Sequence, residues 1–463
     1  MVSEALTPEQ RATRGKDVRS SVPRSDHAAW EPPSDRTSPI KTLSAQDATR
    51  LPDLVPFRYG RMLVSPFTFY RGAAAIMAAD LAATPSSGIQ VQLCGDAHLS
   101  NFGVFRAPSR ELVFDINDFD ETHPGPFEWD LKRLAASLEI AGRERGFKSK
   151  QRRAVTVASA QQYCDSMARF AEMRDLDVWY SRLDVDDIVE RWTAGISPAK
   201  LRRAEKNIAK AENKDSLRAL AKLTVRDGDG PPRIASRPPL LVPITELAGD
   251  HDVEGLVKAA LADYRRSLRP EYRRLLDSYS YADAAHKVVG VGSVGNRAWI
   301  SLMLGRDADD PLFLQFKEAQ TSVLEPFTAA SRYAQHGRRV VEGQRLMQAA
   351  SDPLLGWLTA EGIDGQRRDF YVRQLWDGKG SAEVEAMDPA DMIAYAQMCG
   401  WTLARAHARS GDQIEIAGYL GGGKTFSRAI GEFAVAYTDQ NQRDYEEMGA
   451  AVDADRIEVQ TGL

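Results

Sequence analysis

The amino-acid sequence predicts an α+β protein, and three features carry that prediction. Helical patterns dominate residues 131–280, where apolar positions recur at helical spacing. Short β-like runs separated by turn residues occupy residues 288–316, with another candidate strand at 370–375. Apolar side chains on one helical face then recur through residues 389–408, and a further helical pattern covers 426–448. The chain is therefore expected to combine a hairpin-rich sheet with a larger helical part.

The composition is that of an ordinary folded protein. The 463 residues are 43% hydrophobic and 27% charged, and 60 basic against 65 acidic residues leave a net charge of -5. This balance provides no overall positive field to attract nucleic acid or an anionic membrane, so we expect neither as a partner. At roughly 150 residues per domain, the length corresponds to about three domains or to one elaborated enzyme.

The cysteines and the apolar segments indicate the cellular compartment. Cys94, Cys164 and Cys399 lie far apart and form no CxxC pair, which is typical of a reducing environment. The first residues lack the apolar core of a secretory signal. No stretch reaches the roughly 18 apolar residues that a membrane span needs. These features predict a cytoplasmic protein.

The N-terminal and middle parts of the chain differ in texture. Residues 1–55 are rich in charge, Ser and Pro, which predicts a mobile arm or a surface wrap. Packed core is expected from about Arg58, with a helix over 72–83 and a strand over 89–93. Acidic residues interleave with the basic ones of residues 200–214, which favours a solvated, salt-bridged helix face over a nucleic-acid site.

The densest group of chemically functional residues follows the strand at 89–93. Asp96 lies in the next loop, Asn101 follows five positions later, and a second strand leads to Asp118. A carboxylate in such a loop can face a substrate hydroxyl, while an Asn oxygen and a second carboxylate hold a hard divalent cation. These residue types predict phosphoryl transfer, in which positioning and charge neutralisation do most of the catalysis.

This segment resembles the catalytic loop of aminoglycoside phosphotransferases and choline kinases, a branch of the protein-kinase-like superfamily. Their pattern is H-G-D-x-H-x-x-N, followed by a hydrophobic strand that ends in Asp. The resemblance implies that Asp96 is the catalytic base, Asn101 a metal ligand and His98 a residue that orders the loop. Cys94 stands where these enzymes usually have His.

Two carboxylates are candidates for the second metal ligand. In these phosphotransferases the metal Asp precedes, by about twelve positions, an Asp at the start of a helix. Asp130, in Trp129-Asp130-Leu131, lies at that spacing from Asp118. The resemblance therefore favours Asp118 as the ligand, with Asp115 as second choice and Asp130 as a brace of the catalytic loop. Asp residues also cap helices and close turns, but the combination of spacings favours the phosphotransferase interpretation.

The nucleotide-binding features come after the catalytic loop in the chain. A G-x-G-x-x-G run lies between β-like segments, and its glycines allow backbone N–H groups to approach phosphate oxygens. A strand follows this run rather than a helix, which favours a glycine-rich hairpin over a dinucleotide-binding turn. The residues expected to contact the nucleotide phosphates are Gly290, Gly292, Ser293, Gly295 and, on a following strand, Lys317.

The resemblance also implies partners for Lys317 and for the adenine ring. Glu342, on the helix after the lysine strand, is expected to pair with Lys317, and Glu325 is the alternative. The expected adenine contacts are Gln374, Leu375 and Trp376. Residues 399–408 resemble the helix that runs directly into the catalytic loop of ordinary phosphotransferases. Because that loop lies about 300 positions earlier here, we expect a circular permutation, which contacts between chain ends can accommodate.

The motifs and their order resemble those of a bacterial family of unknown function that is grouped with kinase-like proteins, over about residues 55–450. The implied fold is a circularly permuted, bilobal protein-kinase-like fold, with a small antiparallel nucleotide-lobe sheet and a large, mainly helical lobe. Its expected parts are a mobile arm (1–55), the catalytic-loop half of the helical lobe (56–145), a helical region with the acceptor pocket (146–286), the nucleotide lobe (287–385) and closing helices (386–463).

The implied function is an ATP-dependent phosphotransferase that uses Mg²⁺ or Mn²⁺ and transfers the γ-phosphoryl group to a hydroxyl. Only eleven residues separate Asp118 from Asp130, too few for the long segment on which protein kinases bind peptides. A small-molecule acceptor is therefore expected.

Several alternatives stay open at this point. Residues 418–425 fit the P-loop pattern G-x-x-x-x-G-K-[ST] after strand-like residues 413–417, although no later strand offers an acidic metal ligand. A kinase-like fold can also transfer AMP to a protein or act as a non-catalytic binding module. A metal-dependent phosphohydrolase is a further alternative, and its ligands would be Asp96, His98, Asp115, Asp118 and His123.

Overall fold

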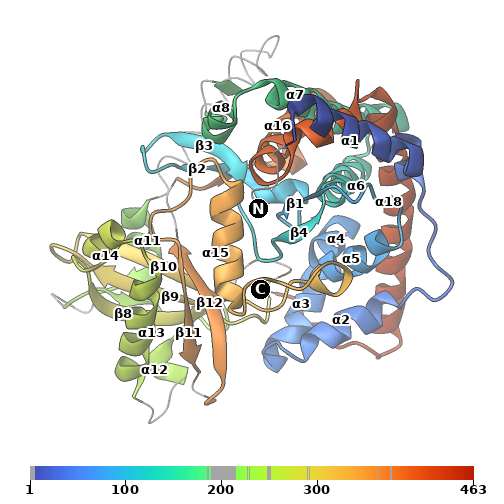
Figure 1. Ribbon diagram of the computed structural model, residues 1–463. Coiled ribbons are helices and arrows are strands. Elements are labelled where there is room, and N and C mark those ends of the chain that lie inside the picture. The colour runs from blue at the N-terminus through green and yellow to red at the C-terminus, as the bar shows by residue number, and fades with distance from the viewer. Residues whose placement is uncertain are drawn as a thin grey trace.

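The structure, a computed structural model, describes residues 6–184, 187–188, 215–226, 228, 230–247, 252–288, 290, 292, 294–362, 364–375 and 378–462. The basic stretch at 200–214, Ser293 and Trp376 lie outside the described residues. The described fold is α+β, as the sequence predicts, with a six-stranded sheet beside a larger body of helices (Figure 1). None of the described helices is long and apolar enough to cross a membrane.

The helices occur both before and after the sheet strands in the chain. In chain order, the described α-helices are α1 (Pro8–Ser21), α2 (Pro39–Asp47), α3 (Val55–Met62), α4 (Pro66–Gly72), α5 (Ala74–Ala82), α6 (Glu128–Glu144), α7 (Ser149–Glu172), α8 (Asp175–Tyr180), α11 (Ser216–Leu223), α12 (Ile244–Leu247), α13 (Val253–Ser267), α14 (Pro270–Leu276), α15 (His336–Met347), α16 (Pro389–Ser410), α17 (Gln413–Leu420) and α18 (Lys424–Asp453). The helices predicted over 389–408 and 426–448 are therefore confirmed, as α16 and α18.

The six-stranded sheet is antiparallel throughout, in the order β11–β12–β10–β9–β8–β7. Its strands are β7 (Leu241–Pro243), β8 (Ser280–Lys287), β9 (Ala298–Leu304), β10 (Pro311–Glu318), β11 (Gly356–Glu361) and β12 (Arg367–Gln374). Strands β8 and β9 pair as the predicted glycine-rich hairpin, and Lys317 lies near the end of β10. Local patterns of apolar residues predicted β9 and β10, whereas β8 ends at Lys287, just before the first β-like run that the sequence analysis names.

Different helices cover the two faces of this sheet, because successive side chains of a strand point to opposite faces. Leu314 and Phe316 of β10 pack with residues of α13 and α14 on the outer face. Phe313 packs with residues of α11 on the inner face. Lys317 shares the parity of Phe313 in the strand, so it points toward the helical body. Helix α15 stands between the sheet and that body (Figure 1).

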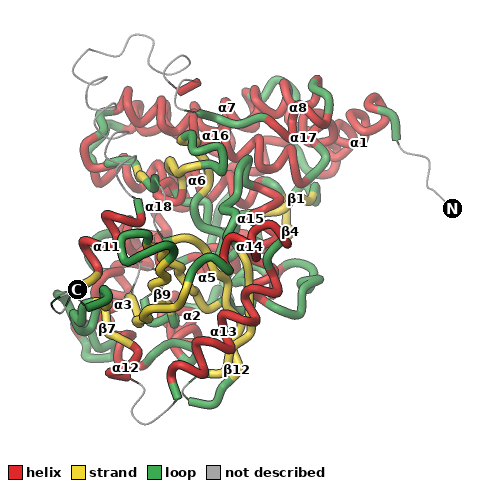
Figure 2. The backbone as a smooth tube through the Cα atoms, turned by 90° about the vertical axis from the view of Figure 1, so that its left-hand side faces the viewer, coloured by secondary structure: helices red, strands yellow, loops and turns green. Residues whose placement is uncertain are grey.

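The helical body consists of α6, α7, α16, α17 and α18, which pack on one another. Figure 2 shows α7, α16 and α17 above the strands of the six-stranded sheet. Gly400 of α16 permits the close approach of α7, because a Cβ at this position would lie 2.3 Å from the Ser159 carbonyl oxygen. Most of α6 is buried, including Leu131 and Leu134. This body forms the main hydrophobic core of the described chain.

The stretch 8–54 wraps the surface of the helical body rather than extending from it as a mobile arm. Helix α1 packs on α17, and Arg11 pairs with Asp412 at 2.7 Å. His27 is fully buried and lies 2.7 Å from the Tyr419 hydroxyl. Arg36 reaches Asp80 and Asp444 at 2.7 and 2.6 Å. The polar composition of residues 8–54 does not indicate this packing, because ion pairs as well as apolar contacts hold the wrap in place.

The middle region is divided between the two parts of the fold, whereas the sequence analysis assigns residues 146–286 to the helical lobe. Helix α7 belongs to the helical body. Strands β7 and β8 belong to the six-stranded sheet, and α11 and α13 pack against it. The short strands at 241–243 and 280–287 carry too little apolar alternation to be separated from helical sequence.

Short strands between the sheet and the helical body present the loops of the candidate site. β1 (Gln90–Leu93) pairs with β4 (His123–Pro126). β2 (Phe102–Arg106) pairs with β3 (Leu112–Ile116) and with β13 (Gly380–Ser381). The loops at 94–101 and 117–122 therefore begin and end on paired strands, which fixes their positions.

The P-loop alternative does not match the fold. Residues 413–417, which such a site requires as a strand, belong to helix α17. Asp412 caps this helix by accepting hydrogen bonds from the backbone of Ile414 and Glu415. A Cβ on Gly418 would lie 2.4 Å from the Ala12 carbonyl oxygen, so this glycine serves the contact between α17 and α1.

Gly418→Ala is accordingly expected to lower the free energy of unfolding by about 1–3 kcal/mol, because the added methyl group overpacks a helix contact. Gly449→Ala in α18 is the matched control. A Cβ at that position meets nothing within 4 Å, so the change should raise stability by about 0.5–1 kcal/mol. Urea unfolding of both variants provides the comparison. Equal stability changes at the two positions would contradict the packing described for Gly418.

Candidate active site

A cavity of about 530 Å³ lies where the sheet, the helical body and the N-terminal wrap meet. Small-molecule sites commonly have volumes of about 300–1,000 Å³. The cavity is lined by the predicted residues Asp96, His98, Asn101, Asp118, Gly290 and Gly292. The structure thus brings together the catalytic loop and the glycine hairpin, which lie nearly two hundred positions apart in the chain.

Asp130 holds the start of the catalytic loop, residues 94–101, in place. Its carboxylate accepts hydrogen bonds from the backbone N–H groups of Cys94 at 2.8 Å and Gly95 at 3.0 Å. Nε2 of His407, on α16, lies 3.3 Å from the same carboxylate. Gly95 has a φ of 84°, and a Cβ there would meet the Glu121 carbonyl oxygen, so the turn requires glycine. Asp130 therefore holds the start of the loop through the backbone of Cys94 and Gly95.

Asp96 has a defined orientation inside the cavity. Arg133 of α6 donates to its Oδ1 at 2.6 Å, and this charge-assisted bond fixes the carboxylate. The side-chain amide of Asn101 donates to the Asp96 carbonyl oxygen at 2.8 Å. That bond uses the amide nitrogen of Asn101 and leaves its side-chain oxygen as an acceptor. Nε2 of His98 lies 3.7 Å from the Asp96 carboxylate, so His98 packs beside the loop.

Lys317 lies directly against the loop at 117–122, the acidic loop, which carries Asp118 and Asp120. Its Nζ is 2.5 Å from Asp120 and 3.7 Å from Asp118. Burial raises the pKa of Asp118, but the charges of Lys317, Arg373 and Lys379 outweigh burial and lower it below the ordinary value. Burial lowers the pKa of Lys317, but the charges of Asp118 and Asp120 raise it by a larger amount. The pKa of Lys317 therefore lies above its ordinary value. Both partners are therefore charged at neutral pH.

The predicted partnership of Lys317 with Glu342 is wrong. Glu342 lies 3.6 Å from Arg345 on its own helix, and the carboxylates that contact Lys317 are those of Asp118 and Asp120. Helix α15 instead turns Arg339 toward the site. The Arg339 guanidinium donates to the carbonyl oxygens of Asp120, Thr122 and Gln320. It thereby holds the acidic loop and the segment after β10 together.

The alternative, Glu325, does not contact Lys317 either; its carboxylate accepts a hydrogen bond from the Ser331 backbone N–H at 3.0 Å. Asp115 lies outside the cavity and is fully buried. Its carboxylate is paired with Arg405 of α16 and accepts from the backbone N–H groups of Ile116 and Ala349, both at 2.8 Å. These bonds give Asp115 a structural role.

The glycine hairpin is held against the N-terminal wrap. Arg50 donates to the Val294 carbonyl oxygen at 2.5 Å, and the Leu51 N–H donates to the Gly295 carbonyl oxygen at 2.8 Å. Arg61 donates to the carbonyl oxygen of Gly290. A Cβ on Gly292 would lie 3.1 Å from the Arg71 carbonyl oxygen. The hairpin therefore approaches the cavity closely along its backbone.

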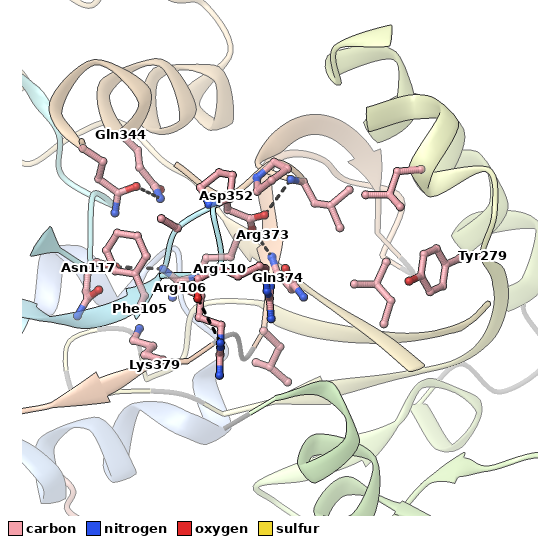
Figure 3. Close-up of a pocket in the computed structure, with 18 residues that line it drawn as sticks. Phe105, Arg106, Arg110, Asn117, Tyr279, Gln344, Asp352, Arg373, Gln374 and Lys379 are labelled. Atoms are coloured by element: carbon pink, nitrogen blue, oxygen red, sulfur yellow. Dashed lines mark hydrogen bonds between the residues drawn. The ribbon is translucent and has the colours of Figure 1, made fainter. Parts of the chain in front are cut away.

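Gln374 and Leu375, two of the three residues predicted to contact adenine, line a second cavity of about 300 Å³ (Figure 3). Figure 3 shows Arg373 and Gln374 near its middle, with Asn117 toward one end and Tyr279 at the other. The Gln374 N–H donates to Asp352 at 2.6 Å, and the Leu375 N–H donates to Phe313 at 3.0 Å. The structure therefore does not place Gln374 and Leu375 beside Asp96. Asn117 lines this second cavity, whereas its neighbour in the chain, Asp118, lines the main one.

The walls of the main cavity include a part of the chain that the sequence analysis does not assign to the site. Residues 37–79 of the wrap and of α4 and α5 line the main cavity, whereas no described residue of 146–286 does. Sequence reasoning missed Asp120, Arg133, Arg339 and Arg71. Of these four residues, Asp120 alone could have been found from the sequence, because it lies two positions after Asp118, a predicted metal ligand. The arginines are distant in sequence, and only the tertiary fold brings them to the site.

Acid should weaken the fold through His98. Burial lowers the pKa of this imidazole to about 4, below the value of about 6.5 expected when unfolded. Between these values the unfolded chain binds more protons, so the free energy of unfolding falls as the pH drops from 6.5 to 4. Relative to His98→Gln, the wild-type protein is expected to lose about 2–3 kcal/mol of stability between pH 7 and pH 4.5. Parallel stability curves for the two proteins, measured by urea unfolding, would refute this role.

The fold and the cavity define an α+β protein in which an acidic loop pair, a strand lysine and a glycine hairpin converge. The chain belongs to a family described as uncharacterized protein conserved in bacteria (DUF2252), whose model matches residues 50–451. No curated protein and no solved structure matches the chain. The family description names no substrate, so function is inferred from the chemistry of the cavity.

Proposed function

We propose that this protein is an ATP-dependent phosphotransferase of circularly permuted kinase-like architecture, which transfers the γ-phosphoryl group to a hydroxyl of a small molecule. The observation that carries the proposal is that Asp96, Asn101, Asp118 and the glycine hairpin line one cavity, with Lys317 Nζ 3.7 Å from Asp118. These residues supply a base, oxygen ligands, a phosphate-binding cation and backbone donors, the parts that phosphoryl transfer uses.

Asp96 is the base in this mechanism. Its carboxylate accepts the proton of the acceptor hydroxyl while the hydroxyl oxygen bonds to the γ-phosphorus. The bond from that phosphorus to the β–γ bridging oxygen breaks, and ADP leaves. Arg133 orients the carboxylate and Asp130 holds the loop that carries it, so the base is positioned before the substrate binds.

The residues fit a hard divalent cation such as Mg²⁺. The side-chain oxygen of Asn101 is left as an acceptor, and Asp118 is an ionised carboxylate that lines the cavity. No group of three or more His, Cys, Asp or Glu side chains among the described residues is arranged to hold a metal. A Mg²⁺ site of one carboxylate and one amide takes its other ligands from phosphates and water, and the ion neutralises phosphate charge.

Lys317 binds the nucleotide phosphates in this proposal. Asp120 holds the ammonium group at 2.5 Å, and the Tyr371 hydroxyl donates to Asp120 at 2.6 Å. Asp120 therefore positions Lys317, the role the resemblance assigns to an acidic residue on the following helix. The glycine hairpin supplies backbone N–H groups from the other side of the phosphates.

The products formed from ATP provide the test. The protein is incubated with MgATP and a set of small hydroxyl compounds, and the products are separated by chromatography and weighed as intact masses. Phosphotransfer gives ADP and an acceptor heavier by one phosphoryl group. Formation of AMP and pyrophosphate, with an adenylylated product, would replace the proposal with nucleotidyl transfer. Release of phosphate without nucleotide would instead indicate a phosphohydrolase.

A further inference from the structure

Two arginines, Arg50 and Arg71, line the main cavity but have no part in the mechanism above. Both belong to the wall formed by residues 37–79. Arg71 is in the last turn of α4, and Arg50 precedes α3. The glycine hairpin lies close to both, with Gly292 near the Arg71 backbone and Gly295 near the Arg50 side chain.

Arg71 lacks a counterion within the described part of the chain. Its side chain makes no ion pair or hydrogen bond with a described residue, and its Nε is buried without a partner. The carboxylates of Asp96, Asp118 and Glu385 act on it electrostatically, but none of them lies within ion-pair distance, and Asp96 and Asp118 have partners of their own in Arg133 and Lys317. Arg71 is half-buried, and a cation withdrawn from water without a partner is costly, so such a site favours an anion that arrives from outside the fold.

The Arg50 side chain is buried and makes one hydrogen bond to the described part of the chain. It is 9% exposed, donates through Nη1 to Val294, and keeps a buried Nε without a partner. No described carboxylate pairs with it. Its side chain therefore adds positive charge to the same wall while supporting the hairpin. A guanidinium presents several donors in one plane, a geometry that matches phosphate and carboxylate groups.

We propose that Arg71, assisted by Arg50, forms an anion subsite for the acceptor, which is therefore a hydroxyl compound that also carries a phosphate or carboxylate group. This assignment rests on the proposed phosphotransfer. The nucleotide phosphates already have Lys317, the hairpin and the metal ligands. Arg71 lines the same cavity as Asp96, the group that receives the proton of the acceptor hydroxyl. The acceptor would be anchored by its anion while its hydroxyl faces that base.

Calorimetric titration with inorganic phosphate tests the subsite without requiring catalysis. The full chain is first saturated with Mg²⁺ and the β,γ-imido analogue of ATP, so that the nucleotide positions are filled. Phosphate is expected to bind this complex, with affinity reduced at least tenfold in Arg71→Ala and less in Arg71→Lys. Arg174→Ala, which removes an exposed cation, is the matched control and should bind phosphate like the wild type.

The outcomes separate the subsite from the proposed function. Unchanged phosphate binding in Arg71→Ala, or no binding by the wild type, overturns the subsite. Displacement of phosphate by the nucleotide analogue assigns Arg71 to the nucleotide and overturns the acceptor assignment. Failure of the analogue itself to bind contradicts phosphotransfer, while phosphate titration of the free protein still reports on Arg71. Arg71→Ala should also unfold no more readily than the wild type, because it removes an unpaired cation; clear destabilisation would indicate a structural ion pair instead.

Discussion

Asp96→Asn is expected to lower turnover by a factor of at least about 10², while the affinity for MgATP stays within about threefold of wild type. The amide keeps the size of the carboxylate and a hydrogen-bond acceptor for Arg133, but it cannot take the proton of the acceptor hydroxyl. Steady-state kinetics with an identified acceptor measures turnover, and calorimetry measures nucleotide binding. A loss in turnover with intact binding separates a base from a residue that only shapes the cavity.

Asp439→Asn is the matched control for Asp96→Asn. Asp439 also pairs with an arginine, at 2.6 Å, but it is half exposed and lies outside the cavity. Its substitution removes the same charge and should leave turnover unchanged. Wild-type turnover in Asp96→Asn would remove Asp96 from the mechanism.

The second large effect concerns Asp115 and Asp118, the two candidates for the second metal ligand. Asp115→Ala is expected to lower the free energy of unfolding by about 3–5 kcal/mol, because it leaves Arg405 buried and unpaired. Asp118→Ala should cost much less stability, since Lys317 keeps Asp120 as its partner. Urea unfolding measures both changes.

The effect on Mg²⁺-dependent nucleotide binding should be large for the Asp118 variant and small for the Asp115 variant, the opposite of their effects on stability. Asp118→Ala is expected to abolish the dependence of ATP affinity on Mg²⁺ concentration, whereas any Asp115 variant that remains folded retains it. ATP titrations at several Mg²⁺ concentrations provide this comparison. A Mg²⁺ dependence that is lost with Asp115 and kept without Asp118 would reverse the assignment of the metal ligand.

Features encoded by local pattern could be predicted from the sequence. Strands β9 and β10 alternate apolar residues, the hairpin between β8 and β9 follows from its glycines, and the spacing of Asp118 and Asp130 identified a brace that the structure contains. Such features need only neighbours in the chain or a recognisable spacing.

Features that depend on how elements pack could not be predicted in this way. Residues 413–417 begin with alternating polar and apolar side chains like a strand, but the cap at Asp412 and the contact of Gly418 with α1 favour the helix α17. Which side chain of α15 faces the acidic loop depends on the rotation of that helix on the sheet, so Arg339 was missed and Glu342 was preferred. The role of residues 37–79 as a cavity wall likewise exists only in the folded chain.

The most direct test of a single site built from both halves of the chain is the affinity for MgATP of two lysine variants. Lys317 contacts Asp118 and Asp120, whereas Lys424 is exposed at the start of α18, in the segment that fits a P-loop pattern. Lys317→Ala is expected to weaken MgATP binding at least tenfold, because it removes the phosphate-binding cation, and Lys424→Ala should change it by less than about twofold. Loss of binding in Lys424→Ala, with wild-type affinity in Lys317→Ala, would contradict the site described here.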